Sequence, residues 1–241
     1  DAKPFLIEIS ERSYLLKQIS IDTYDFLHLS FQEYFTSLEL KERQDGISII
    51  IDHLFDSWWE ETILLYAGVS KDASLLIKTI EEKKVPEDIF YGKLILYGKL
   101  IADAEFTEPK WREVIINKLW QVYQHTEFYY LKNKIINVLS FIKSDNIIAK
   151  LIEELEGSDY YKTDVIFALG EVGNDKVIDP LIKILTDNKE RDENRWKSAY
   201  ALGKIGDEKI LYILLNIVTN NKKNDETRVY AIIALGEIKD N

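Results

Sequence analysis

A sequence repeat with a period of 33 residues restricts the fold of this chain more than any other feature. The tripeptide Ala-Leu-Gly recurs without gaps, beginning at Ala168, Ala201 and Ala234. After each of the first two tripeptides, a second apolar segment also recurs, in pairs every fourth residue, as expected for one wide face of a helix. The matched positions are Val177, Ile178, Leu181, Ile182 and Leu185 in one unit and Ile210, Leu211, Leu214, Leu215 and Val218 in the next. A two-helix unit cannot bury such a stripe alone, so the units are expected to stack into a solenoid.

The rest of the chain is also predicted to be helical. Its 241 residues include only 10 glycines and 4 prolines, fewer than the turns of a β-rich protein of this length need. We therefore expect an all-α fold, an α-solenoid of helix pairs. One exception lies over 14–29, where two short apolar runs flank a polar turn and predict a β-hairpin. Further helices are expected over 72–82, from Pro86 to 102, from Pro109 onward, and over about 126–143 and 145–156.

Composition excludes several classes of protein and site. The net charge of −11 disfavours binding of nucleic acid, because phosphate is repelled. No apolar run approaches the roughly 20 residues that span a bilayer, and no signal-peptide pattern is present, so we expect a cytoplasmic protein with no membrane partner. The absence of cysteine excludes disulfides and thiolate metal ligands. The three histidines are scattered, so no metal site is expected.

The repeats resemble HEAT repeats of the short type, over about 160–241. The resemblance rests on the Ala-Leu-Gly segments and on the apolar helix that follows the first two of them. The third copy ends without its second helix, from which we expect the natural protein to continue beyond this chain.

A second resemblance concerns the first 70 residues. The segment Phe26-Leu27-His28-Leu29-Ser30-Phe31-Gln32-Glu33-Tyr34-Phe35 resembles a motif of NACHT-type (STAND) NTPases, which are signal-transducing ATPases. This resemblance implies the winged-helix end of a NACHT module over 1–44, a helical linker domain over 45–125 and a HEAT-repeat sensor over 126–241. It also implies a role in bacterial anti-phage defence and self-association of the full-length parent.

In that family, the histidine at the position of His28 contacts the β-phosphate of bound ADP. Ser30 and Glu33 form a capping box after it, so His28 is expected just before a helix N-terminus, which favours an anion. The phosphate-binding loop G-x-x-x-x-G-K-[ST] is absent from the sequence. We therefore expect no cofactor and no enzymatic activity in this chain, while ATP or ADP is expected in the parent.

The expected partner is a protein partner or a trigger, bound on the concave face that the second helices of a solenoid line. Polar side chains between the apolar stripes are not needed for packing, and Tyr212 is the strongest anchor among them because aromatic residues are favoured at interfaces. The candidate partner-binding residues are Lys176, Asp179, Lys183, Lys209, Tyr212 and Asn216.

Two alternatives stay open from the sequence. In the first alternative, the chain is a HEAT-repeat scaffold without a nucleotide switch. In the second, it is related to the HEAT-like bilin lyases, which also carry short Ala-Leu-Gly repeats. The absence of cysteine gives the second alternative no support.

Overall fold

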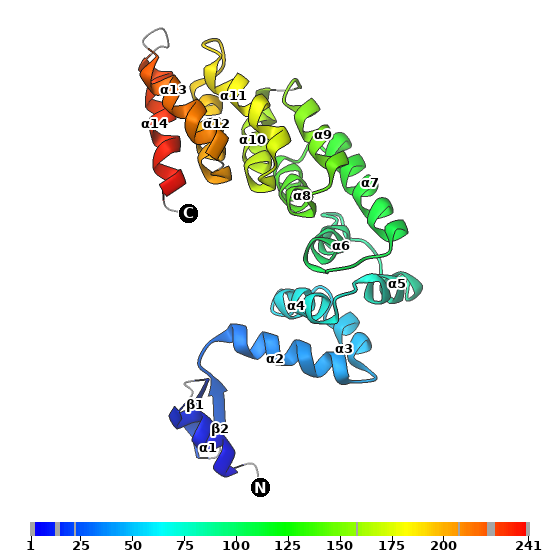
Figure 1. Ribbon diagram of the computed structural model, residues 1–241. Helices are drawn as coiled ribbons and strands as arrows, with labels where there is room; N and C mark the ends of the chain where they lie inside the picture. The colour runs from blue at the N-terminus through cyan, green and yellow to red at the C-terminus, as the bar shows by residue number, and fades with distance from the viewer. Residues whose placement is uncertain are drawn as a thin grey trace. The chain divides into compact units, whose positions relative to one another are not determined.

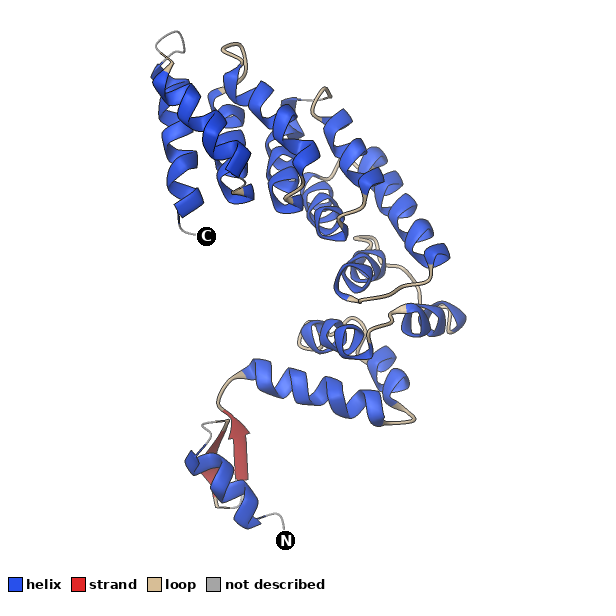
Figure 2. Ribbon diagram, in the orientation of Figure 1, coloured by secondary structure: helices blue, strands red, loops and turns tan. Residues whose placement is uncertain are grey.

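The computed structural model describes residues 3–12, 15–21, 23–157, 159–206, 208–220 and 225–239. Within these residues the regular structure is helical apart from two short strands (Figure 1, Figure 2). This confirms the all-α class and the hairpin. The elements in chain order are α1 (Lys3–Arg12), β1 (Leu16–Ser20), β2 (Thr23–Phe26), α2 (Leu29–Glu42), α3 (Gly46–Asp52), α4 (Glu60–Ser70), α5 (Ser74–Glu82), α6 (Gly92–Asp103), α7 (Pro109–His125), α8 (Tyr129–Ile142), α9 (Asp145–Glu154), α10 (Asp159–Val172), the 3-10 turn η1 (Asp175–Val177), α11 (Ile178–Thr186), α12 (Asp192–Ile205), α13 (Glu208–Thr219) and α14 (Asp225–Lys239).

The chain divides into two compact units, residues 1–115 and 116–241. The domain boundaries expected after residues 44 and 125 rest on the family resemblance and stay a prediction.

The first unit begins with α1, the β1–β2 hairpin and α2. The strands pair antiparallel, with Leu16 opposite Phe26 and Gln18 opposite Tyr24. Most side chains of β1 are exposed, and the core of the unit lies further along the chain. Its fully buried side chains include Ile50, Ile63, Leu76, Ile77, Ile80 and Leu100. Helix, hairpin and helix follow one another as the end of a winged-helix domain requires, but the winged helix itself stays a prediction.

The helix expected from Pro86 begins later than predicted. α6 starts at Gly92, and the preceding residues form a loop held by acidic side chains. The carboxylate of Glu87 accepts hydrogen bonds from the backbone N–H groups of Lys93 and Leu94, at 2.9 and 3.1 Å. These N–H groups are free only in the first turn of a helix, so the Glu87 side chain fixes the helix start downstream of the proline.

The helices of the second unit form two layers. In one layer α8, α10, α12 and α14 lie side by side in this order, and α9, α11 and α13 form the other layer (Figure 1). The first helix of a pair ends at a glycine in the left-handed region, Gly173 with φ 62° after α10 and Gly206 with φ 67° after α12. A residue with a side chain adopts this conformation at a cost, which explains why glycine recurs at the end of these two helices.

The predicted buried stripe is confirmed for α11 but is partly wrong for α13. Val177, Ile178, Leu181 and Leu185 are fully buried, as predicted for the first unit of the repeat. In α13, however, Leu211 and Leu215 are exposed by 38% and 47%, and Ile210, Leu214 and Ile217 supply the buried face. The far side of α13 has no neighbouring second-layer helix among the described residues, so only the side towards α14 is covered.

Candidate partner-binding site

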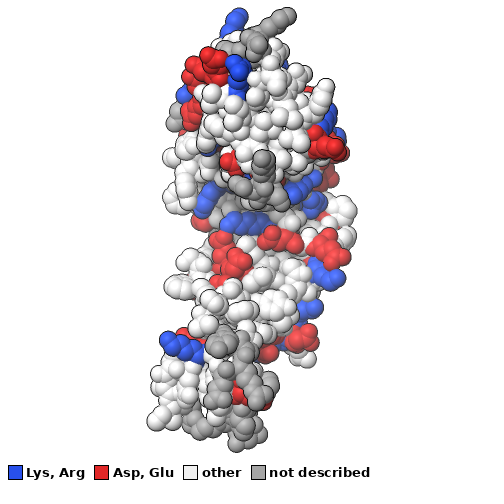
Figure 3. Space-filling model, turned by 60° about the vertical axis from the view of Figure 1, so that its left-hand side comes forward, with Lys and Arg blue, Asp and Glu red and all other residues white. Residues whose placement is uncertain are grey.

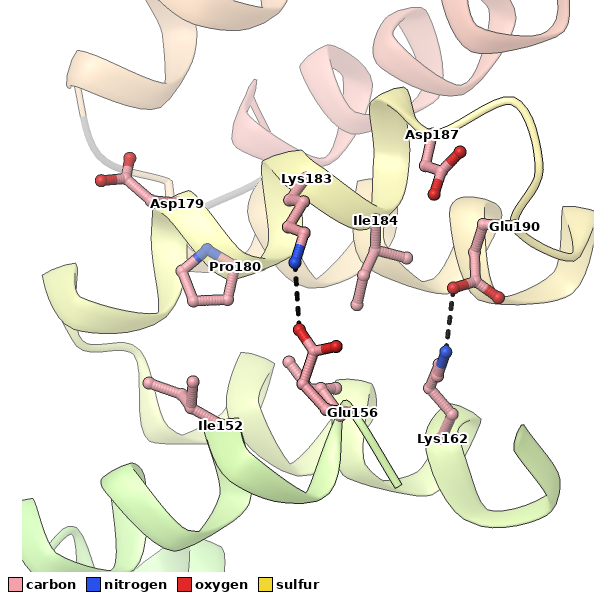
Figure 4. A pocket seen from close by; sticks show the side chains of 10 residues that line it. Ile152, Glu156, Lys162, Asp179, Pro180, Lys183, Ile184, Asp187 and Glu190 are labelled. Atoms are coloured by element: carbon pink, nitrogen blue, oxygen red, sulfur yellow. Dashed lines mark hydrogen bonds and ion pairs between the residues drawn. The ribbon is translucent and has the colours of Figure 1, made fainter. Parts of the chain in front are cut away.

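A groove lies between the second-layer helices α9 and α11 of the second unit. Its volume is about 520 Å³. Apolar side chains of Ile152, Leu155, Pro180 and Ile184 line it (Figure 4). The groove thus offers apolar surface between two helices that the repeat itself places next to each other, as ligand-binding recesses usually do.

Charged side chains form the rim of the groove. Lys183 from α11 reaches Glu156, which follows α9, with 3.0 Å between the ammonium nitrogen and the carboxylate oxygen. At the other end Lys162 pairs with Glu190, also at 3.0 Å (Figure 4). The side chains of the first pair are exposed by about three quarters, so this pair is weak, whereas those of the second pair are only 13% and 12% exposed.

Glu190 belongs to a hydrogen-bonded network that ties α10 to α12. Burial alone would raise the pKa of its carboxyl, but hydrogen bonds from Asn194 and Lys162 lower the pKa below its usual value. Thr163 donates a further hydrogen bond to Asn194, at 2.8 Å. Glu190 is therefore held as a carboxylate in a fixed position at the rim.

Carboxylates outnumber ammonium groups around the groove. Glu156, Asp179, Asp187 and Glu190 face two lysines, Lys162 and Lys183. Both lysines are already paired with the two glutamates, so Asp179 and Asp187 provide the excess negative charge. This excess attracts a cationic group.

The structure places the predicted partner-binding residues in two sets at equivalent repeat positions. Lys176, Asp179 and Lys183 lie on η1 and α11, where Asp179 and Lys183 line the groove and Lys176 pairs with Asp145 at 2.8 Å. Lys209, Tyr212 and Asn216 lie on α13 and are exposed, Tyr212 by 74%. The groove residues Glu156, Asp187 and Glu190 were not predicted, because they come from the loops that join the helices. No partner is present in the structure, so a binding role for all six residues stays a prediction.

His28 lies in the first unit, directly before α2. It is the N-cap residue with φ −126° and ψ 134°, so the helix begins at Leu29 and the predicted N-cap role of Ser30 is wrong. The reason is that Ser30 already has helical geometry within the first turn. The imidazole is exposed and packs beside the ring of Phe31, with 6.0 Å between ring centroids. His28 is thus accessible to a ligand, while its nucleotide role stays a prediction.

Other site types find no support in the described part of the chain. No three His, Asp or Glu side chains gather there as a metal site would require. None of the described helices is both long and apolar enough to cross a bilayer. On the face that Figure 3 shows, basic and acidic side chains alternate and leave large uncharged areas between them.

Comparison with known proteins assigns HEAT repeats to residues 148–236. The match begins within α9, before the repeats recognisable by their Ala-Leu-Gly motifs, and it confirms the HEAT-type solenoid. The resemblance of residues 1–70 to NACHT-type NTPases lies outside it and stays a prediction. No curated protein matches the chain. Among solved structures, human deoxyhypusine hydroxylase in complex with glycerol matches with a TM-score of 0.44 and 15% identity, over 90% of this chain and 82% of that chain.

Proposed function

We propose that the second unit is a protein-binding module that takes an extended peptide segment in the groove between α9 and α11. HEAT repeats generally mediate contacts between proteins, and the single observation that carries the proposal is the groove itself, with an apolar lining and a charged rim. The excess of carboxylates favours a segment with lysine or arginine between apolar residues.

Charge reversal at Asp179 tests this proposal. Peptides are first selected from a random library on the wild-type protein, and their affinities are measured by fluorescence anisotropy. We expect Asp179→Lys to weaken the binding of the selected peptides about tenfold, since one attractive pair becomes a repulsive one, a change of roughly 1.4 kcal/mol.

Asp175→Lys is the matched control. Asp175 is exposed one turn earlier, outside the groove, so this variant changes the net charge equally and is expected to bind normally. Equal weakening by both variants would show that only the long-range field matters. Unchanged binding by Asp179→Lys would place the peptide elsewhere.

A second contact is proposed at Tyr212. Asp179 occupies the same repeat position in α11 and is exposed, even though another second-layer helix, α13, follows it. A side chain at this position is therefore not needed to pack neighbouring repeats. We expect Tyr212→Ala and Lys183→Glu each to change the stability by less than about 0.5 kcal/mol. Tyr212→Ala should bind the selected peptides more weakly in the same assay because an aromatic contact is lost, and wild-type affinity would argue against Tyr212. Lys183→Glu adds negative charge at the rim and should bind a cationic peptide at least as tightly as the wild type.

A second candidate function is the sensor portion of a NACHT-type signalling ATPase, with a role in anti-phage defence. Its support is the segment 26–35 and the exposed position of His28 at the start of α2. In this proposal the partner bound by the second unit is the trigger, and the first unit transmits binding to a nucleotide switch outside this chain. The chain itself is then not an enzyme and holds no cofactor.

The His28 proposal is tested in a protein that joins this chain to its NTPase domain. We expect His28→Ala to weaken ADP binding by roughly 1–3 kcal/mol, because one charge-assisted hydrogen-bond donor is lost. Titration calorimetry with ADP measures this change, and His53→Ala, a histidine stacked on Trp59 in the same unit, is the control. An unchanged affinity in the His28 variant would remove His28 from the nucleotide site.

A further inference from the structure

The contact between neighbouring first-layer helices occurs twice in the second unit with the same geometry. A Cβ added at Gly170 in α10 would lie 2.8 Å from the Cβ of Ala201 in α12. A Cβ added at Gly203 in α12 would lie 2.7 Å from the backbone oxygen of Ala234 in α14. At each of these two glycines the next helix leaves no room for a side chain.

None of the residues that the structure describes covers the same face of α14. A Cβ added at Gly236, the third glycine of the repeat, would meet nothing within 4 Å. Ile232 is 54% exposed, whereas Ile166 and Ala199 at the same repeat position of α10 and α12 are fully buried. Val229 adds a further exposed apolar side chain, at 51%. Figure 3 turns the left-hand side of Figure 1, where α14 lies, towards the viewer, and an uncharged area lies between charged groups in the upper part of that view.

α14 carries charged side chains at the repeat positions that link neighbouring first-layer helices elsewhere in the unit. Glu171 of α10 pairs with Lys204 of α12, and α14 carries Glu237 at the same position. Arg195 of α12 reaches Glu226 and Thr227 at the start of α14. Its counterpart in α14 is Arg228.

The two arginines differ in how far their side chains are buried. The side chain of Arg195 is 2% exposed and that of Arg228 is 37% exposed. Both donate to a carbonyl in the last turn of the preceding helix, that of Leu185 in α11 and that of Val218 in α13. Arg228 and Glu237 thus flank the apolar centre of the face at its two ends.

We propose that this face of α14, formed by Arg228, Val229, Ile232, Gly236 and Glu237, binds the first helix of a further HEAT-type helix pair, parallel to α14. The partner helix has a carboxylate or hydroxyl in its first turn facing Arg228. It has a small residue opposite Gly236 and a lysine facing Glu237. In both existing contacts, α10 with α12 and α12 with α14, the two helices run parallel. A contact on α14 that continues this series is made by a parallel HEAT-type helix and not by an unrelated apolar surface. The proposal is independent of the peptide groove.

The test extends the chain by one repeat. A copy of residues 174–206 is joined after position 239 in place of 240–241, and Lys239 is changed to glycine, because the equivalent Gly173 and Gly206 have positive φ. The copied Ala201 then falls opposite Gly236 and the copied Lys204 faces Glu237. The control extension carries leucine and glutamate at these two copied positions.

Thermal unfolding provides the main measurement. We expect the matched extension to raise the Tm by about 4 °C or more over the control extension. Gly236→Ala is expected to raise the Tm of the original chain, since alanine favours helix and the site is open. The same substitution is expected to lower the Tm of the extended chain, where the copied helix occupies the space.

Three results would overturn the proposal. The first is an equal Tm for both extensions, and the second is a stabilising Gly236→Ala in both backgrounds. The third is a dimer of the original chain in light scattering that Ile232→Glu dissociates, because a second copy of the chain would then be the occupant of this face.

Discussion

Replacing Arg195 with methionine is expected to lower the free energy of unfolding of the second unit by about 3 kcal/mol. The guanidinium is buried and donates hydrogen bonds to the carbonyl of Leu185 and to the hydroxyl of Thr227. It also lies over the ring of Tyr230, with 5.4 Å to the centroid. Methionine fills a similar volume but removes these two hydrogen bonds from a charged donor, which are worth roughly 1.5–3 kcal/mol each.

Arg228→Met is the matched control for this substitution. Arg228 occupies the same repeat position, donates to the carbonyl of Val218 and pairs with Asp225, but is partly exposed. Water can replace its contacts, so we expect a loss of about 1 kcal/mol. Urea unfolding followed by circular dichroism measures both variants. Equal losses would show that burial against α14 adds nothing to the strength of the Arg195 network.

Gly203→Val is expected to destabilise the second unit by about 3 kcal/mol. The Cβ would lie 2.7 Å from both the oxygen of Ala234 and the Cβ of Glu237, so α12 and α14 must separate. Overpacking of this kind typically costs 1–3 kcal/mol, and the branched side chain lies at the upper end because a backbone atom cannot move aside.

Gly236→Val tests whether the loss of stability expected for Gly203→Val comes from the steric clash or from the helix preference of valine. A Cβ added there meets nothing within 4 Å, and valine is slightly better than glycine inside a helix. We expect a stability equal to or slightly above that of the wild type, measured by the same urea unfolding. A large loss in the Gly236 variant would mean that the face of α14 is covered in solution.

Much of the fold could be predicted because its signals are local. Helices of the second unit follow from apolar residues at helical spacing, and the expected segments 126–143 and 145–156 correspond to α8 and α9. The start of α6 could not be predicted from Pro86, since the carboxylate of Glu87 bonds to N–H groups six and seven residues further on. For the candidate site, the exposed residues of α11 were predicted, but the groove was not, because Lys183 and Glu156 meet only when two repeats stack.

The sequence by itself determined the repeat and its period of 33 residues, which puts Gly170, Gly203 and Gly236 at equivalent positions of successive units. Only the tertiary structure decided which copy of a repeated residue is buried. Ile166 and Ile232 share a repeat position and an amino-acid type, yet one is fully buried and the other is 54% exposed. The physical reason is that local sequence sets the direction in which a side chain points from its helix, whereas burial depends on whether another helix lies there.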